Sequence, residues 1–389
     1  MRIVIDGETL CDESGGVGAG IEHYSWEVVS HLVKQKTDHT FFLCPPKVLS
    51  PDRLRMLIEG AQSKVVVMRP WISDVPFFSR HVLLPLRFLL CRADVFFSPF
   101  GQLPFGWFKR SVITVHDVAI YEHPEWFSAL PNQDFSTRVI VPRSIRRADR
   151  LLAVSRTTAE RVVRLFPSVA AKTAVVYEGV QIPKGFSFDA TSKRFPFDRD
   201  VILSLGTIEP RKNLTLAIEA FDLFLRQHPE CATTVRFVIA GKKGWGTEEV
   251  FRLVEEVNRV WLDLEPEGVI QFLGTVSEEE KWTLLARASV FVFPSFDEGF
   301  GLPVLEAMAV GTPVIASRSD AVVEVGGDAV MCVDDAESFA LAMAQCVLLP
   351  EGVKMLRQDG LDRARQFSWE KTAKETLKMI EDVGKVGEI

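Results

Sequence analysis

The chain has 389 residues, 47% hydrophobic and 25% charged, which is typical of a folded protein too long for one ordinary core. Its net charge of −7 at pH 7 argues against nucleic acid as a partner. The six scattered cysteines form no CxxC pair and no metal-ligand spacing. They predict reduced thiols in a cytoplasmic protein without a bound metal. The start, MRIVIDGETL, does not resemble a secretory signal.

Short β-rich apolar runs alternate with helical patterns along the whole chain, which is typical of parallel α/β sheets. The segment 21–35 places Ile21, Tyr24, Val28 and Leu32 on one helical face. The proline- and glycine-containing stretch 181–200 breaks the alternation and predicts an interdomain linker. In the first half, strands are expected at 2–6, 40–44, 64–68, 94–98, 111–115, 151–155 and 174–178.

The most apolar stretch is 76–97, which arginines and Pro85 interrupt, so it is not a membrane-spanning helix. Two interpretations stay open. One is a core helix, and the other is an interfacial helix with its apolar side in a membrane and its arginines at the headgroups. A second basic cluster follows at 138–150. Peripheral contact with an anionic membrane surface is therefore expected for the first half only.

Two loops of the first half contain candidate binding residues. The glycine-rich loop 14–23 runs into a helix, but Ile21 stands where a dinucleotide-binding loop needs a small residue. An anion-binding or cleft-lining loop is the better interpretation. His116 and Asp117 follow the strand 111–115. This histidine either contacts a substrate hydroxyl or forms a structural hydrogen bond.

A second α/β series follows the linker and predicts a second Rossmann-like domain. In such sheets ligands bind beyond the carboxyl ends of the strands, and a cleft between the two sheets is the expected site. The helices of this half include 213–228 and 277–288. Its strands are expected at 201–206, 235–241, 269–274, 290–295, 313–317 and 329–333.

The loop GTIEPRKNL (206–214) places Arg211 and Lys212 directly before a helix that Asn213 caps. Cations are normally disfavoured at a helix N-terminus. An anion is therefore expected to compensate them. A diphosphate fits, because arginine forks and free helix N–H groups both bind phosphate.

The loop FDEGFGLP (296–303) precedes a short helix expected at 303–310, with Pro303 at its start and Gly311 at its end. The glycines allow backbone N–H groups to approach a ligand. Glu298 and Glu306 are suited to accept hydrogen bonds from sugar hydroxyls. In the alternative interpretation, Glu306 only complements the helix dipole and Glu298 is a solvated turn residue.

These loops resemble the retaining family 4 glycosyltransferases of the GT-B fold, and the resemblance spans nearly the whole chain. It implies two Rossmann-like domains facing each other across a cleft: an acceptor-binding domain at 1–182 and a nucleotide-sugar-binding domain at 200–366. A C-terminal helix at about 369–389 would cross back onto the first. The motifs are similar to those of bacterial mannosyltransferases of surface polysaccharides, and comprise SGGVGAGIEHYSWEVV, TVHDVAIYEHPEWF, GTIEPRKNL, VIAGKKGW, VIQFLGTVSEEE, FVFPSFDEGFGLPVLEAMAVGTPVIAS and QFSWEKTA.

The resemblance also implies roles for individual residues. Arg211 and Lys212 would hold the donor diphosphate, Glu298 the hydroxyls of the transferred sugar and Glu306 those of the ribose. His116 would lie near the donor sugar. The remaining donor contacts would come from both halves: Gly18 and Gly20 near the diphosphate, Leu273 and Val276 at the base, and Phe300, Gly301 and Leu302 at the sugar or phosphate. No metal and no cofactor beyond the nucleotide sugar is implied.

Two departures from the family pattern concern the first half. The glycine-rich loop GVGAGIEHY carries an extra small residue, and Glu178 replaces a more usual asparagine. The implied reaction transfers a hexosyl unit, mannose from GDP-mannose as the first choice, to a saccharide or lipid-linked saccharide. The alternatives are a UDP-sugar transferase, a nucleotide-sugar 2-epimerase and a catalytically silent nucleotide-sugar-binding protein. The implied location is the cytoplasm, including the cytoplasmic face of the membrane.

Overall fold

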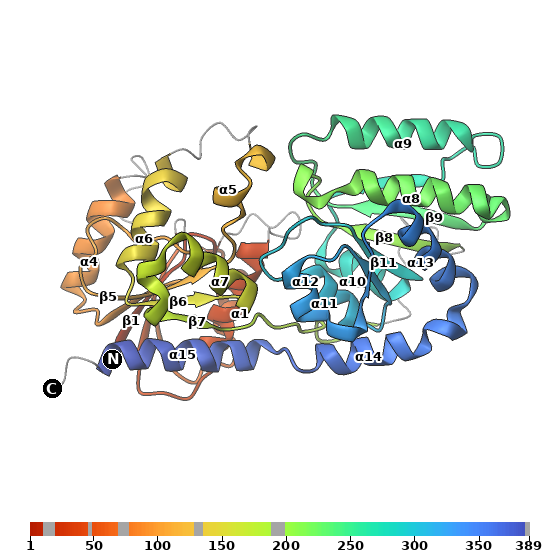
Figure 1. Ribbon diagram of the computed structural model, residues 1–389. Coiled ribbons are helices and arrows are strands. Elements are labelled where there is room, and N and C mark those ends of the chain that lie inside the picture. Colours follow the sequence, from red (N-terminus) through yellow and green to blue (C-terminus); the bar gives the residue numbers. More distant parts are fainter. Residues whose placement is uncertain (11–19, 46–48, 69–77, 128–134, 188–198, 386–389) are drawn as a thin grey trace. The chain divides into compact units, whose positions relative to one another are not determined.

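Figure 1 shows a computed structural model of the chain, which forms two compact units. It describes residues 1–10, 20–45, 49–68, 78–127, 135–187 and 199–385. Unit 1 comprises residues 1–118, 131–179 and 367–389, and unit 2 comprises residues 119–130 and 180–366. The segment 119–130, which the sequence assigns to the first domain, thus groups with the second unit.

Unit 1 contains a parallel sheet of seven strands in the order β3-β2-β1-β4-β5-β6-β7. The order reverses between β1 and β4, which is where ligands bind in open α/β sheets. The interior of the sheet is apolar, as Ile3, Val4 and Ile5 of β1 are fully buried. The strands are β1 (Arg2–Asp6), β2 (Thr40–Cys44), β3 (Lys64–Val67), β4 (Val95–Ser98), β5 (Arg110–Val115), β6 (Arg150–Ala153) and β7 (Thr173–Val175).

The C-terminal helix α15 (Trp369–Lys385) belongs to unit 1 (Figure 1). Trp369 is buried with its ring edge-on to Tyr24 of α1. A Cβ at Gly179 would lie 2.2 Å from the backbone nitrogen of Trp369, so only glycine fits there. The other helices of this unit are α1 (Gly20–Val33), α2 (Pro51–Ile58), α4 (Leu84–Leu90), α6 (Val141–Arg147) and α7 (Arg156–Leu165), with π-helical turns Ser79–Leu83 and Ser136–Ile140 preceding α4 and α6.

Unit 2 contains a parallel sheet of six strands in the order β10-β9-β8-β11-β12-β13. Phe221, Phe224 and Phe237 are among its largest fully buried side chains. Its strands are β8 (Asp200–Leu205), β9 (Val235–Ala240), β10 (Ile270–Gly274), β11 (Val290–Phe293), β12 (Val314–Ala316) and β13 (Met331–Cys332). Its helices are α5 (Ala119–Glu122), α8 (Leu214–Gln227), α9 (Glu248–Val260), α10 (Glu278–Arg287), α11 (Leu302–Ala309), α12 (Asp320–Gly326), α13 (Ala336–Leu348) and α14 (Lys354–Ala364).

The predicted α/β fold is confirmed, and all but one of the predicted strands end within two residues of the observed ones. The exception is 174–178, where β7 ends at Val175. Most of the predicted linker, 188–198, lies outside the described residues. Within the apolar stretch 76–97, residues 78–90 are helical with one buried and one exposed side, residues 95–97 belong to β4, and 76 and 77 lie outside the described residues. The buried side agrees with a core helix, and membrane contact of the exposed side stays a prediction. Among the described helices none is singly long and apolar enough to span a membrane, although the sharply bent pair Ala336–Leu348 and Pro350–Lys385 meets the length and composition test together.

Candidate active site

The loop after β8 brings two cations to the start of α8. Residues Pro210–Lys212 form a 3₁₀ turn, and Asn213 takes the left-handed conformation before the helix begins at Leu214. Asn213 occupies the predicted N-cap position of α8, but its side chain does not bond to the helix backbone. Its Oδ1 accepts a hydrogen bond from the Thr215 hydroxyl at 3.3 Å, and no cap bond to the helix backbone forms.

The loop after β11 leads into α11, as the proline and glycine positions predict. Gly301 has a φ of +98° and immediately precedes the helix, which begins at Leu302 with Pro303 in its first turn. Gly311 follows the helix with a φ of +78°. The backbone therefore needs glycine at both ends of α11. Of the predicted sugar or phosphate contacts, the Phe300 side chain is buried and Leu302 is nearly so.

Glu298 joins these two loops, because both cations of the first loop pair with its carboxylate. The Lys212 Nζ lies 2.6 Å from its Oε1, and an Arg211 guanidinium nitrogen lies 3.0 Å from its Oε2. Arg211 also donates to the Asp297 carbonyl at 2.7 Å and pairs with Glu209 at 2.8 Å. Since Glu298 is only 8% exposed, its interpretation as a solvated turn residue is wrong.

The electrostatics of this cluster keep Glu298 ionised. Burial alone would raise the pKa of this carboxyl, but the attraction of Arg211 and Lys212 outweighs burial and lowers the pKa to about 2. The anion expected to compensate the two cations is thus provided by the protein itself.

Glu306, one turn inside α11, has its own cationic partner. It is buried, and the Lys281 Nζ lies 2.6 Å from its Oε1 and 2.8 Å from Glu278. Burial alone would lower the pKa of Lys281, but Glu306 and Glu278 outweigh it and raise this pKa. Glu306 is therefore more than a residue that complements a helix dipole. Lys281 was not anticipated from the sequence, although the capping box Ser277–Glu280 marks the helix start that positions it.

A small pocket adjoins the first cluster at the carboxyl ends of β8, β9 and β11. Gly206, at a φ of +143°, borders it, and a Cβ there would contact the Lys212 side chain at 3.6 Å. Of the residues predicted at the base, Leu273 is the second-last residue of β10 and is partly buried, and Val276 is buried two residues after the strand ends. The pocket is lined by Ser204, Leu205, Gly206, Thr207, Lys212, Leu214, Ile239, Phe293, Pro294 and Ser295.

Unit 1 contains the candidate residues His116, Gly18 and Gly20. His116 uses both ring nitrogens: Nε2 lies 2.7 Å from the Pro99 carbonyl and Nδ1 lies 3.4 Å from the Glu178 carboxylate. A carbonyl only accepts, so Nε2 is the protonated nitrogen. The unexpected Glu178 is thus a buried partner of His116. Gly20 is exposed at the start of α1, and Gly18 lies outside the described residues.

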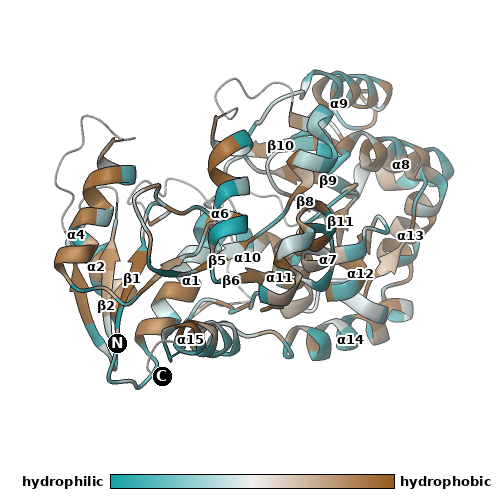
Figure 2. Cartoon of the chain, turned by 60° about the vertical axis from the view of Figure 1, so that its left-hand side comes forward, coloured by the Kyte–Doolittle hydropathy of each residue, from teal (hydrophilic) through white to brown (hydrophobic). Residues whose placement is uncertain are grey.

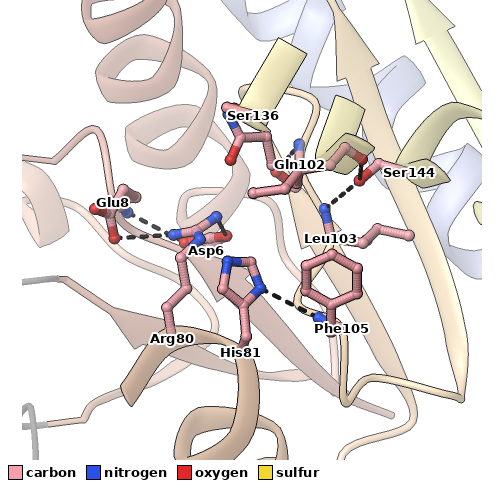
Figure 3. A network of polar contacts seen from close by, with 11 residues as sticks. Asp6, Glu8, Arg80, His81, Gln102, Leu103, Phe105, Ser136 and Ser144 are labelled. Atoms are coloured by element: carbon pink, nitrogen blue, oxygen red, sulfur yellow. Dashed lines mark hydrogen bonds and ion pairs between the residues drawn. The ribbon is translucent and has the colours of Figure 1, made fainter. Parts of the chain in front are cut away.

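A polar network that was not anticipated from the sequence lies at the carboxyl end of β1 (Figure 3). Arg80 bridges Asp6 and Glu8, at 2.9 Å from each carboxylate. Burial raises the pKa of Asp6 to about 6 although Arg80 opposes this. His81 accepts a hydrogen bond from the Phe105 backbone, and burial next to Arg80 lowers its pKa to about 4. In the sequence, Arg80 is one of the arginines that interrupt the apolar stretch 76–97.

Family models match both halves of the chain. The model described as Glycosyltransferase Family 4 matches residues 18–182, and the model described as Glycosyl transferases group 1 matches residues 187–363. The O-antigen chain mannosyltransferase B of Escherichia coli is 31% identical over 278 residues, which are 69% of this chain and 69% of that protein. A D-inositol 3-phosphate glycosyltransferase of Nocardioides is 30% identical over 60% of this chain and 53% of its own length.

Solved structures agree on the fold. The structure of Anabaena HepE in complex with UDP and glucose superposes with a TM-score of 0.69 at 17% identity, covering 98% of this chain and 100% of the other. At this identity the likeness concerns the architecture alone. Together with the family models and the identity to the Escherichia coli protein, it shows that the chain belongs to the family 4, group 1 glycosyltransferases and has their GT-B fold.

Proposed function

We propose that this glycosyltransferase moves a mannosyl unit from GDP-mannose to a saccharide or lipid-linked saccharide of a bacterial surface polysaccharide, with retention at the anomeric carbon. The mannosyl choice is supported by the similarity to an O-antigen mannosyltransferase. The observation that carries transfer chemistry is the buried cluster of Arg211, Lys212 and Glu298 at the N-termini of α8 and α11.

The donor diphosphate binds to Arg211 and Lys212. As the bond between sugar and phosphate breaks, negative charge builds on the leaving diphosphate, and two preorganised cations in a largely buried site stabilise it. The N–H groups at the start of α11 add further donors. Glu306, oriented by Lys281, accepts the ribose hydroxyls. We expect that no metal is required. Treatment with EDTA should therefore leave the transferase activity unchanged.

Retention proceeds by attack on the same side from which the diphosphate leaves. A double displacement needs a carboxylate nucleophile below the anomeric carbon. Glu298 is the candidate in these loops, but the family resemblance places its carboxylate at the hydroxyls of the transferred sugar and not below the anomeric carbon. The leaving phosphate then takes the proton of the acceptor hydroxyl. A covalent glycosyl-enzyme trapped on Glu298, or an inverted product, would contradict this course.

Thermal shift against nucleotide diphosphates and their sugars tests the donor. A ligand that binds only the folded state stabilises it and so raises the melting temperature. At a ligand concentration about a hundred times Kd, the free energy of unfolding rises by about 2.7 kcal/mol. Stabilisation by GDP and GDP-mannose above the UDP series is the expected result. Stabilisation by UDP-sugars alone would mean that the donor is a UDP-sugar and not GDP-mannose. No shift with any nucleotide would favour a catalytically silent protein.

A further inference from the structure

The helical segment 78–90 of unit 1 exposes apolar side chains along one side. Phe78, Val82, Leu86, Leu89 and Leu90 are between 44% and 69% exposed. They recur at the spacing of one helical face. The other side of the same helix is buried in unit 1, where Phe88 packs against Phe96 and Trp107. The helix α4 is therefore apolar on both sides, and Figure 2 shows it largely brown.

Adjoining segments extend this surface. Phe108 is 73% exposed and Phe135 is 52% exposed. The loop 103–110 that carries Phe108 is fastened to both helical segments: the Gly106 N–H donates to the His81 carbonyl, and Arg147 of α6 donates to the Trp107 carbonyl. We call the five residues of the 78–90 helix, together with Phe108 and Phe135, the apolar face.

The segments that carry the apolar face contain basic side chains and no acidic ones, and of these basic side chains Arg80 pairs with Asp6 and Glu8. The segments 78–93, 95–116 and 135–148 contain no aspartate or glutamate, in a chain whose net charge is −7. Asp94 and Asp149, which border these segments, already accept hydrogen bonds from the backbone of Arg2 and Ser111. The same segments carry nine cations: Arg80, Arg87, Arg92, Lys109, Arg110, Arg138, Arg143, Arg146 and Arg147.

We propose that the apolar face docks unit 1 onto an anionic lipid bilayer, with its aliphatic and aromatic side chains among the acyl chains and the cations at the headgroup phosphates. An amphipathic surface of this kind binds through buried apolar area and attraction to anionic lipid together. A second copy of the chain is a poorer occupant, because a twofold contact would bring two cation-rich surfaces together. Lipid binding is measured without donor or acceptor, so the test is independent of the proposed function.

The experiment is sedimentation of the full chain with vesicles of phosphatidylcholine, with and without about a third of phosphatidylglycerol. The wild type is expected to bind the anionic vesicles and to release as salt screens the attraction. The double variant Leu86→Glu/Leu90→Glu should lose at least about tenfold in partitioning, because two leucines no longer enter the acyl region. Arg92→Gln should partition onto the anionic vesicles about fivefold more weakly than the wild type, because one cation near the headgroups is lost.

The matched control is Leu341→Glu/Met355→Glu, since these unit 2 side chains are 59% and 78% exposed. It should bind vesicles like the wild type, and all variants should melt like the wild type because the substituted side chains are exposed. The proposal is overturned if the wild type ignores anionic vesicles, or if the control loses as much binding as the double variant. It is also overturned if Leu86→Glu/Leu90→Glu instead converts a dimer into a monomer.

Discussion

Replacing Glu298 with glutamine tests the electrostatics of the candidate site. A carboxyl whose pKa falls from 4.5 to about 2 on folding contributes about 3 kcal/mol at neutral pH, because each tenfold difference in proton affinity corresponds to about 1.4 kcal/mol. The folded-state pKa is lowered, so this contribution is present above pH 4.5 and disappears as the pH falls towards 2. At pH 3 about 1.4 kcal/mol should remain.

The assay compares urea unfolding of wild type and Glu298→Gln at pH 7, 5 and 3, using a unit 2 signal. We expect the variant to be less stable by about 3 kcal/mol at pH 7, with the gap narrowing to less than half by pH 3. Glu351→Gln is the control, because its partner Lys354 is exposed and the pair contributes little. A gap that does not change with pH, or no gap, would refute the assigned pairing of Glu298.

Two further variants address buried ion pairs of unit 2. Lys281→Met removes the partner of Glu306 and should weaken GDP binding by about tenfold or more in calorimetry. Unchanged affinity would contradict the proposed contact of Glu306 with the ribose hydroxyls. Glu265→Gln leaves Arg236 buried without its carboxylate partner and should cost about 3 kcal/mol of unfolding free energy. Glu256→Gln, which removes an exposed partner of Arg252, should leave stability unchanged, and an equal loss in both would refute the role of burial.

Glu298 also competes with the donor for the same cations. When its charge is removed, Arg211 and Lys212 become available to a diphosphate, so we expect Glu298→Gln to bind GDP at least as tightly as the wild type. The same variant should bind GDP-mannose less tightly relative to GDP, since a contact to the sugar hydroxyls is lost. Calorimetric titration of both ligands gives the ratio. Loss of affinity for GDP alone would mean that Glu298 contacts the nucleotide.

The sequence predicted the fold well because each strand is a short apolar run between turn residues, and parallel sheets bury such runs on both sides. It also predicted the local form of α11, since Pro303 and Gly311 restrict the backbone by themselves. Both depend on residues close together in the chain. Of the site, Arg211 and Lys212 were recognised because cations at a helix start need compensation.

Partners distant in sequence were not predictable in this way. The pairing of Glu298 with the loop of Lys212 depends on two β–α loops meeting at one sheet edge, and the pairing of Lys281 with Glu306 depends on how α10 packs on α11. Glu178 departs from the family pattern, and its contact with His116, 62 residues earlier in the chain, is likewise long-range. The sequence also could not predict which side of the 78–90 helix is exposed, because apolar residues alone do not show which side packs against the rest of the protein.

The central claim is that Arg211 and Lys212 stabilise the leaving diphosphate, and Lys212→Ala tests it most directly. The measurement is the turnover rate of mannosyl transfer from GDP-mannose to lipid-linked saccharide in bacterial membranes, with exposed Lys354→Ala as the control. The account predicts a loss of about a few hundredfold in kcat for Lys212→Ala, assayed at a temperature where the variant is fully folded, and none for the control. An unchanged kcat in Lys212→Ala would contradict it.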